Sequence, residues 1–180
     1  MRPSKLLPGV LVVFSLNCSH LPAQKGNSPR MESPWELRMV TEGVKLRAVL
    51  HNRTKMPQTF LYDSKIQPVE LILTPESGKA IEPSDTRAEA KFDNTVYRHM
   101  YKQVAPQADE TLTEAAVTAD RSLRWGPFLF TNLAHGVYRA QAVWRSETNE
   151  YYDPKSKRNV VLKDIWMGAI TSNTIELRVP

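Results

Sequence analysis

Hydrophobic and polar residues alternate with a period of two along several stretches of the chain. The clearest alternations cover residues 44–50, 69–73, 138–144 and 175–179. In each stretch one set of side chains is apolar and the intervening set is mostly polar, which is typical of a β-strand with one buried face. The pattern therefore predicts these core side chains: Leu46, Leu71, Tyr138, Trp144 and Leu177.

Shorter segments add further strands between these alternations. They cover residues 36–40, 58–62, 95–103, 123–125, 160–162 and 165–170. Many short strands without intervening helices favour an antiparallel sandwich, because parallel strands need crossover helices. The most helical segment, residues 84–91, would be one short capped turn on a loop. The strand pattern predicts an all-β fold, an antiparallel β-sandwich with a flexible N-terminal segment.

The N-terminal segment has the pattern of a secretory signal. Residues 1–5 are short and basic, residues 6–16 are largely apolar, and residues 19–34 are polar and contain prolines. The apolar run is shorter than the roughly 20 residues that a membrane span needs. A buried N-terminal strand or helix is the alternative. The expected division is a signal peptide at 1–17, a flexible tether at 18–34 and one sandwich domain at 35–180.

Cys18 is the single cysteine of the chain, so no internal disulfide can form. It directly follows the apolar run, a position that resembles the lipid-modification site of bacterial lipoproteins. The match is imperfect, because Leu16 stands one place late and Asn17 replaces Gly or Ala. Ordinary cleavage near Ala23 and an uncleaved anchor are the alternatives. We expect an exported protein that is anchored in the cell envelope by a lipid on Cys18, or that is secreted.

Composition and charge narrow the classes of partner. The chain has 180 residues, of which 41% are hydrophobic and 24% charged, with a formal net charge of +5. These values are typical of a globular domain with a real core. Basic and acidic residues are interspersed along the chain, whereas nucleic-acid-binding proteins usually gather basic residues on one face. We expect no nucleic-acid partner, and membrane contact only through the lipid anchor.

The C-terminal third contains two recognisable motifs. They are Gly-x-Tyr at 136–138 and Trp-x-Gly-x-x-x-Ser-Asn at 166–173. Together they resemble the last two strands of bacterial immunoglobulin-like domains of unassigned function, some of which are similar to BsuPI-type proteinase inhibitor domains. Tyr138 resembles the tyrosine corner of such sandwiches. The resemblance implies that the predicted fold is an immunoglobulin-like antiparallel β-sandwich. We also expect Ser172 and Asn173 to hydrogen-bond their own backbone and turn the chain into the last strand.

No catalytic constellation stands out. The four histidines are spread along the whole chain, although two-histidine metal motifs need close spacing on one element. They are His20, His51, His99 and His135. There is also no Gly-x-Ser-x-Gly elbow and no glycine-rich loop for a phosphate group. We therefore expect a protein that is not an enzyme and that holds neither a metal nor a cofactor.

Two longer insertions, residues 83–109 and 147–164, interrupt the regular succession of predicted strands. Aromatic and basic residues interleave in the first, and the second has two tyrosines at its start and three basic residues at its tip. Loops on a rigid sandwich frequently carry binding residues. The second insertion therefore supplies the first candidates for contact with a partner: Tyr151, Tyr152, Lys155, Lys157 and Arg158.

Three functions are compatible with this sequence. The first is a binding or structural module of the cell envelope with a protein or glycan partner. The second, implied only by the resemblance, is a proteinase inhibitor that inserts an exposed loop such as residues 153–155. The third is a carbohydrate-binding or enzyme-accessory module, which exposed aromatic residues would serve. Coplanar exposed rings would favour a sugar ligand, and a single protruding loop would favour a protease.

Overall fold

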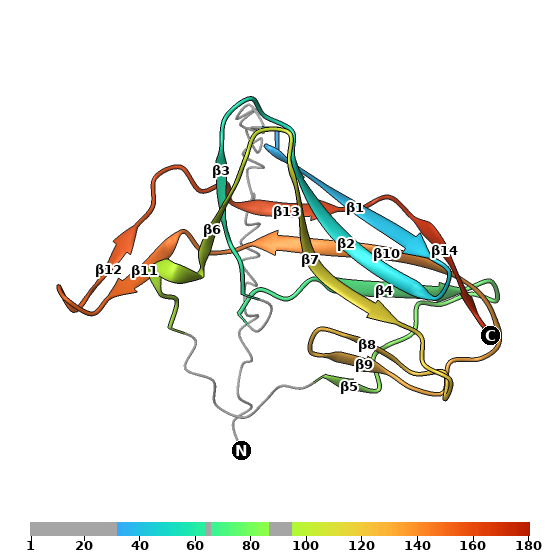
Figure 1. Ribbon diagram of the computed structural model, residues 1–180. Helices are drawn as coiled ribbons and strands as arrows, with labels where there is room; N and C mark the ends of the chain where they lie inside the picture. The colour runs from blue at the N-terminus through green and yellow to red at the C-terminus, as the bar shows by residue number, and fades with distance from the viewer. Residues whose placement is uncertain (1–31, 64–65, 87–94) are drawn as a thin grey trace, which may run out of the picture. The chain divides into compact units, whose positions relative to one another are not determined.

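The structure is a computed structural model and describes residues 32–63, 66–86 and 95–180 (Figure 1). These residues form β-strands and one short 3₁₀ helix, with no α-helix among them. Cys18, the expected signal peptide and most of the expected tether lie outside this part. So do residues 87–91 of the expected helical turn, and its described start is instead strand β5 (Asp85–Thr86). The described part of the chain is all-β, as the sequence predicts.

The first main sheet has the strand order β1–β2–β7 and is antiparallel throughout. Its strands are β1 (Trp35–Glu42), β2 (Lys45–Asn52) and β7 (Asp109–Ala116). The turn between β1 and β2 contains Gly43 at a φ of 65°, a left-handed conformation that glycine adopts without strain. Val44 belongs to this turn and is exposed. The buried alternation therefore begins at Leu46 rather than at Val44.

The second main sheet is built around the long strand β10 (Gly136–Ser146). Strand β4 (Glu70–Pro75) pairs with one edge of β10. Strands β13 (Gly168–Thr171) and β14 (Ile175–Val179) pair in turn along its other edge. All of these pairings are antiparallel, so residues far apart in the sequence lie side by side on β10 (Figure 1).

The two sheets together have the arrangement of an immunoglobulin-like sandwich. In such domains the first, second and fifth strands share one sheet, and the third, sixth and seventh share the other. Here β1, β2 and β7 take the first set of places, and β4, β10 and β14 take the second. The hydroxyl of Tyr138 donates to the carbonyl oxygen of Ala134 at 3.0 Å, which is the tyrosine-corner contact. The predicted fold class is confirmed.

The apolar faces of the two sheets form one core. Leu46 and Leu177 are completely buried, and Leu71, Tyr138 and Trp144 are each less than 8% exposed. The intervening side chains, such as those of Arg47 and Glu176, are exposed. The period-two pattern therefore gives the correct register, because a shift by one residue would exchange the two faces.

Aromatic side chains tie the sheets together at one end of this core. The ring of Phe60 meets that of Trp35 edge-on with centroids 5.5 Å apart, and that of Trp144 edge-on at 5.8 Å. These three rings come from different strands and are almost fully buried. Aromatic pairs in this geometry stabilise a core beyond the area that they bury.

Ser172 and Asn173 join the sheets where β13 ends and β14 has not yet begun. The Ser172 hydroxyl donates to the Asn173 carbonyl at 2.7 Å, which is the local bond that the sequence predicts, and it also accepts the Ala142 N–H at 2.9 Å. Asn173 does not bond its own backbone in this way. Its side-chain amide accepts the Met39 N–H at 2.8 Å and donates to the Met39 carbonyl at 3.1 Å. Asn173 thus covers the outer edge of β1.

Trp166 and Gly168 form a second tight contact within the Trp-x-Gly-x-x-x-Ser-Asn motif at residues 166–173. Gly168 has a φ of 152°, and a Cβ atom on it would lie 2.7 Å from the ring of Trp166. A glycine is required there because no side chain fits beneath that ring. Trp166 in turn stacks on Trp144, with centroids 6.1 Å apart.

Small antiparallel ribbons complete the described part. They are β3 (Gln58–Leu61) with β6 (Tyr101–Val104), β5 with β9 (Phe128–Phe130) and β8 (Leu123–Trp125), and β11 (Glu150–Asp153) with β12 (Arg158–Val161). The strand predicted at 95–103 is wrong for its first part. Residues Arg98–Met100 form the 3₁₀ helix η1, because the Met100 N–H bonds the Tyr97 carbonyl at 3.0 Å and turns the chain.

Candidate functional site

The two insertions that the sequence singles out separately are joined in the structure. The Tyr152 N–H of the β11–β12 hairpin donates to the Val96 carbonyl at 2.7 Å, and Tyr97 and Tyr152 form an isolated parallel bridge. We call β11, β12 and residues 95–100 the arm. It extends beyond the two main sheets at the left of Figure 1. Residues from both insertions therefore belong to a single surface.

A small apolar cluster holds the arm to the sandwich. Its buried members are Leu61 of β3, Tyr101 of β6 and Ile165, which follows β12. The partly buried side chains packed against them are Ile66, Val96, Met100, Tyr151 and Leu162. Because this cluster draws on both insertions and on β3, it fixes the base of the hairpin by burial.

The hydroxyl group of Tyr101 adds a polar anchor to the base of the arm. It donates to the backbone carbonyls of Glu150 at 3.1 Å and Thr148 at 3.4 Å. Burial raises the pKa of the Tyr101 phenol, because its charged form would lose hydration in this position. The raised pKa therefore extends the neutral, donating form of the phenol to higher pH.

The five predicted contact residues have different positions on the arm. Tyr151 is half-buried in the apolar cluster and supports the hairpin. Tyr152 is half-buried on the neighbouring position, where its ring meets Tyr97 edge-on at 6.3 Å. The three basic side chains at the tip are exposed: Lys155, Lys157 and Arg158. Of the five residues, only these three basic ones are exposed.

The first insertion contributes aromatic residues that the sequence does not assign to a site. Tyr97 stacks on His99 with an interplanar angle of 11° and a centroid separation of 5.8 Å. The Tyr97 and Tyr152 rings stand at 81° to each other. The rings are therefore stacked or perpendicular, and they do not form one flat platform. Aromatic and basic residues interleave at 95–101, and this is the sequence feature that could have indicated the aromatic group.

The tip of the hairpin is a tight turn ordered by Asp153. The carboxylate of Asp153 accepts the backbone N–H groups of Lys155 at 3.1 Å and Ser156 at 3.3 Å. The hydrogen bonds from Ser156 and Lys155 lower the pKa of Asp153, because they favour its charged form. Lys157 has a φ of 55°, which closes the turn in the left-handed region. The carboxylate thus fixes the backbone from which the basic side chains project.

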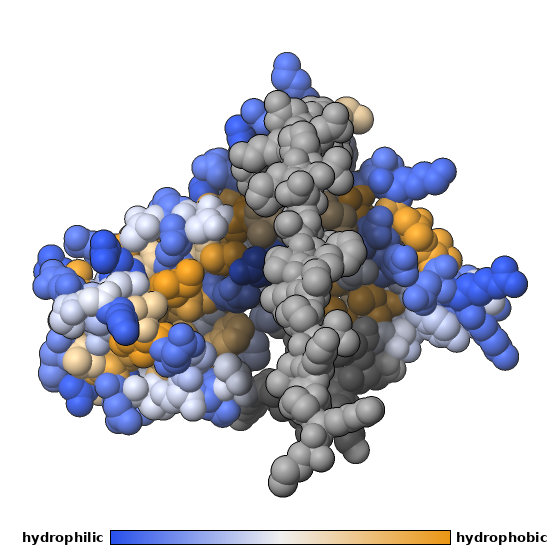
Figure 2. Space-filling model, turned by 180° about the vertical axis from the view of Figure 1, so that it is seen from behind, coloured by the Kyte–Doolittle hydropathy of each residue, from blue (hydrophilic) through white to orange (hydrophobic). Residues whose placement is uncertain are grey.

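Electrostatically, the tip of the arm carries net positive charge. Residues 153–158 contain three basic residues and one acidic residue, Asp153, whose carboxylate interacts with the charge of Lys155. In the part of the chain that the structure describes, none of these three side chains forms an ion pair. Figure 2, which views the molecule from behind, shows mainly hydrophilic residues over the outer end of the arm, at its right. A surface of this kind is hydrated when no partner is bound, and its positive charge attracts acidic groups at a distance.

Potential metal ligands do not gather at one place in the described residues. No cluster of three or more His, Cys, Asp or Glu side chains that could hold a metal ion occurs among them. The ring of His51 contacts the Asp109 carboxylate at 2.7 Å on the face of the first sheet, and His99 takes part in the arm stack. His20 lies outside the described residues. The same part of the chain contains no helix with the length and hydropathy of a membrane span.

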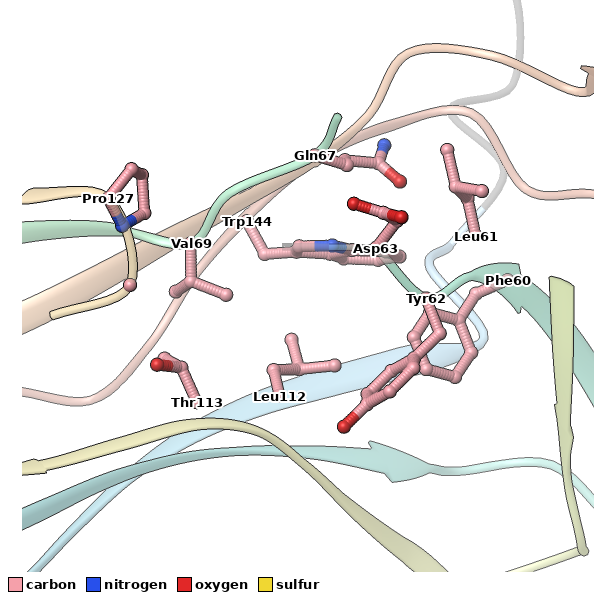
Figure 3. A pocket seen from close by; sticks show the side chains of 11 residues that line it. Phe60, Leu61, Tyr62, Asp63, Gln67, Val69, Leu112, Thr113, Pro127 and Trp144 are labelled. Atoms are coloured by element: carbon pink, nitrogen blue, oxygen red, sulfur yellow. The ribbon is translucent and has the colours of Figure 1, made fainter. Parts of the chain in front are cut away.

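A pocket of about 80 Å³ lies between the two main sheets, and the sequence pattern does not indicate it. Leu112 of β7 and Trp144 of β10 line it from opposite sheets, and Phe60 of β3 adds a third apolar wall (Figure 3). Asp63 and Gln67, between β3 and β4, supply polar groups. Neither residue belongs to a strand or a motif, so no sequence signal marks them as a pair.

Comparison with known proteins gives no further assignment. No model of a protein family matches this chain, and no curated protein or solved structure matches it significantly. The interpretation of the arm and of the pocket therefore depends on their own geometry and charge.

Proposed function

We propose that this protein is an exported, non-catalytic binding module of the cell envelope that contacts its partner through the arm. The basic start of the chain, the apolar run and Cys18 support export and lipid anchoring. The kinship with bacterial immunoglobulin-like domains is part of this proposal. It is supported by the tyrosine-corner bond of Tyr138 and by the packing of Trp166 on Gly168, which give physical reasons for both motifs.

One observation carries the binding role: the arm is anchored at its base and charged at its free end. The buried Leu61, Tyr101 and Ile165 fix the hairpin, while the basic tip makes no ion pair with any described residue. An anchored hairpin loses little conformational freedom when it binds. Exposed charges of one sign accelerate the approach of a partner with the opposite sign. The arm therefore suits an acidic protein or glycan surface.

The geometry of the arm bears on the two alternative functions. A carbohydrate platform needs exposed rings in one plane, whereas Tyr97, His99 and Tyr152 are stacked or perpendicular. An inhibitor of the standard kind presents a rigid, exposed loop to a protease cleft. Residues 154–157 form a closed turn held by Asp153, which presents charge rather than an extended segment. Both alternatives are therefore weaker than a charge-guided protein contact.

The test reverses the charge of the tip and leaves the apolar cluster intact. The variant combines Lys155→Glu, Lys157→Glu and Arg158→Glu. We expect it to fold normally and to lose at least about tenfold in affinity for acidic partners isolated from cell envelopes, mainly through a slower association rate. The binding of the unchanged protein should weaken as salt rises, because screening shortens the range of these charges.

A matched control carries the same change in charge at a distance from the arm. It combines Lys45→Glu, Arg47→Glu and Arg178→Glu, three exposed positions of the main sheets. This control should bind like the unchanged protein. Equal loss of binding in both variants would show that only the net charge matters, and unchanged binding in the tip variant would remove the arm from the contact.

Export is tested by the mass of the mature protein. When the full chain is expressed in a bacterial host, the product should lack the residues before Cys18 and carry lipid, and Cys18→Ala should abolish membrane association. Full-length, unmodified protein in the cytoplasm would contradict both lipid anchoring and secretion.

A further inference from the structure

The pocket between the sheets contains a buried acceptor without a donor. Gln67 is only 8% exposed, and its side-chain Nε2 donates to the Arg145 carbonyl. Its Oε1 is buried and has no hydrogen-bond partner among the described residues. Most buried polar atoms in proteins are paired, because an unpaired one has lost its bonds to water. A bound species with a hydrogen-bond donor would satisfy this oxygen.

A second oxygen-bearing group lines the same pocket. The backbone N–H of Gln67 donates to the Asp63 carbonyl at 2.8 Å, which brings the two residues together. Oδ1 of the Asp63 carboxylate accepts the Ile66 N–H at 3.2 Å. In Figure 3 the amide oxygen of Gln67 is turned toward the side of the Asp63 carboxylate and its nitrogen away from it. This side of the pocket is thus rich in acceptor oxygens, among them those of the Asp63 carboxylate.

The remaining walls are mainly apolar and aromatic, and Thr113 of β7 adds a hydroxyl group. Phe60, Leu112, Val69 and the indole of Trp144 face the space, with Tyr62 beside Phe60 (Figure 3). Such walls suit methylene groups, and aromatic faces attract a cation. The pocket has a volume of about 80 Å³, which corresponds to about three water molecules at roughly 30 Å³ each. A ligand that fits is therefore short, apolar along its stem and cationic at one end.

We propose that this pocket binds a primary ammonium group, of a free alkylamine or of a lysine side chain. An ammonium group has three donors and no acceptor, so it matches an amide oxygen and a carboxylate. Its stem would lie against Phe60 and Leu112. This site is separate from the arm, so the proposal goes beyond the proposed function and can fail independently of it.

The binding experiment uses the full mature protein labelled with ¹⁵N and n-butylammonium as the probe. The side-chain amide of Gln67 and the indole N–H of Trp144 report on the pocket by NMR. We expect saturable shifts of both signals with n-butylammonium. n-Butanol and butyrate, which have similar stems, should bind at least tenfold more weakly, because the first lacks charge and the second has the wrong sign.

Three substitutions assign the effect to this pocket. Asp63→Asn keeps an oxygen for the Ile66 N–H but removes the charge, and it should weaken n-butylammonium binding at least tenfold. Gln67→Met should also weaken it, because it removes the acceptor. Glu176→Gln removes an exposed carboxylate elsewhere and should leave binding unchanged. If Gln67→Met fails to fold, Asp63→Asn still decides the matter.

Clear outcomes would overturn the proposal. One is a pocket that shows only an exchanging water next to Gln67 and no saturable shift with any probe. Another is equal binding of n-butanol, which would make the pocket merely apolar. A third is unchanged n-butylammonium binding in Asp63→Asn.

A second titration distinguishes the two sources of the ammonium group. Nα-acetyl-lysine N-methylamide is compared with its Nε-acetylated form, which has lost the charge. Binding of the first and not the second identifies a lysine side chain of a partner as the ligand. Binding of n-butylammonium alone identifies a free amine. The charge reversal at the arm tip should leave all these titrations unchanged.

Discussion

The main core and the base of the arm are held by the same kind of contact on very different scales. In the sandwich, side chains from both sheets interlock, and Leu46, Leu73 and Leu177 are completely buried. The cluster at the base of the arm has only three buried side chains among the described residues, and two of them, Tyr101 and Ile165, are still 7% and 9% exposed. Stability in a protein is not uniform, and regions with few buried contacts open first. The sandwich should therefore keep its fold when the arm is altered.

The largest expected effect is in the main core. Leu46→Ala removes a completely buried side chain and leaves a cavity between the sheets. We expect a loss of about 2–5 kcal/mol in the free energy of unfolding. Urea denaturation followed by tryptophan fluorescence measures it. A loss below about 1 kcal/mol would mean that this core is packed no more tightly than the arm.

The contact of Asn173 with β1 should have the next largest effect. Asn173→Ala leaves both the N–H and the carbonyl of Met39 without their protein partners. We expect a loss of about 1–3 kcal/mol in the free energy of unfolding, with faster hydrogen exchange at Met39. Thr174→Ala, at the exposed neighbouring position, is the control and should be nearly silent.

The base of the arm can be weakened without disturbing the sandwich. Tyr101→Phe removes the bonds to the Glu150 and Thr148 carbonyls but keeps the ring in the cluster. We expect a local loss of about 1 kcal/mol, seen as faster hydrogen exchange in β11 and β12 and unchanged exchange in β10. Tyr62→Phe alters an exposed tyrosine and is the control. Equally faster exchange in β10 would show that the arm and the sandwich unfold together.

Exposed positions of the main sheets should be nearly neutral. Arg47→Ala and Glu176→Ala change side chains that point to solvent between buried neighbours. Each should alter the free energy of unfolding by less than about 0.5 kcal/mol, measured by thermal denaturation. A loss of several kcal/mol at either position would contradict the strand register.

The smallest expected effect concerns pH and the tip of the arm. The pKa of Asp153 is lowered from its ordinary value of 3.8, so its charged form supports the folded turn. That support is complete above about pH 4 and is lost as pH falls through the lowered pKa. The amide signals of Lys155 and Ser156 should therefore titrate in this acidic range by NMR. In Asp153→Asn the titration should be absent, and its persistence would assign it to another group.

The comparison also shows which parts of the structure local patterns can predict. The alternations around Leu46, Leu71, Tyr138 and Leu177 gave the correct strands and faces, because a half-buried strand imposes a period of two on its own residues. Residues 95–103 also alternate, yet the chain turns at Arg98–Met100. A short alternation does not distinguish a strand from a turn, because a single hydrogen-bonded turn can accommodate the same order of apolar and polar side chains.

The candidate sites depended more on contacts that are distant in the sequence. The positive charge of the tip can be predicted from Lys155, Lys157 and Arg158 in the sequence alone. That Tyr151 supports the hairpin, whereas the tip is exposed, follows only from its packing with residues of the first insertion. The pocket has no local signal, because the orphaned oxygen of Gln67 exists only where the two sheets enclose it.

By itself the sequence determined the all-β class, the buried face of each long strand and the charge of the arm tip. These properties are set by the order of apolar and polar side chains along one strand or turn. The tertiary structure decided that two insertions form one arm, that Asn173 covers the edge of β1, and that Asp63 and Gln67 share a pocket with Trp144. Each of these joins residues that are distant in the chain or that no common pattern links, and only the packing of the whole sandwich brings them into contact.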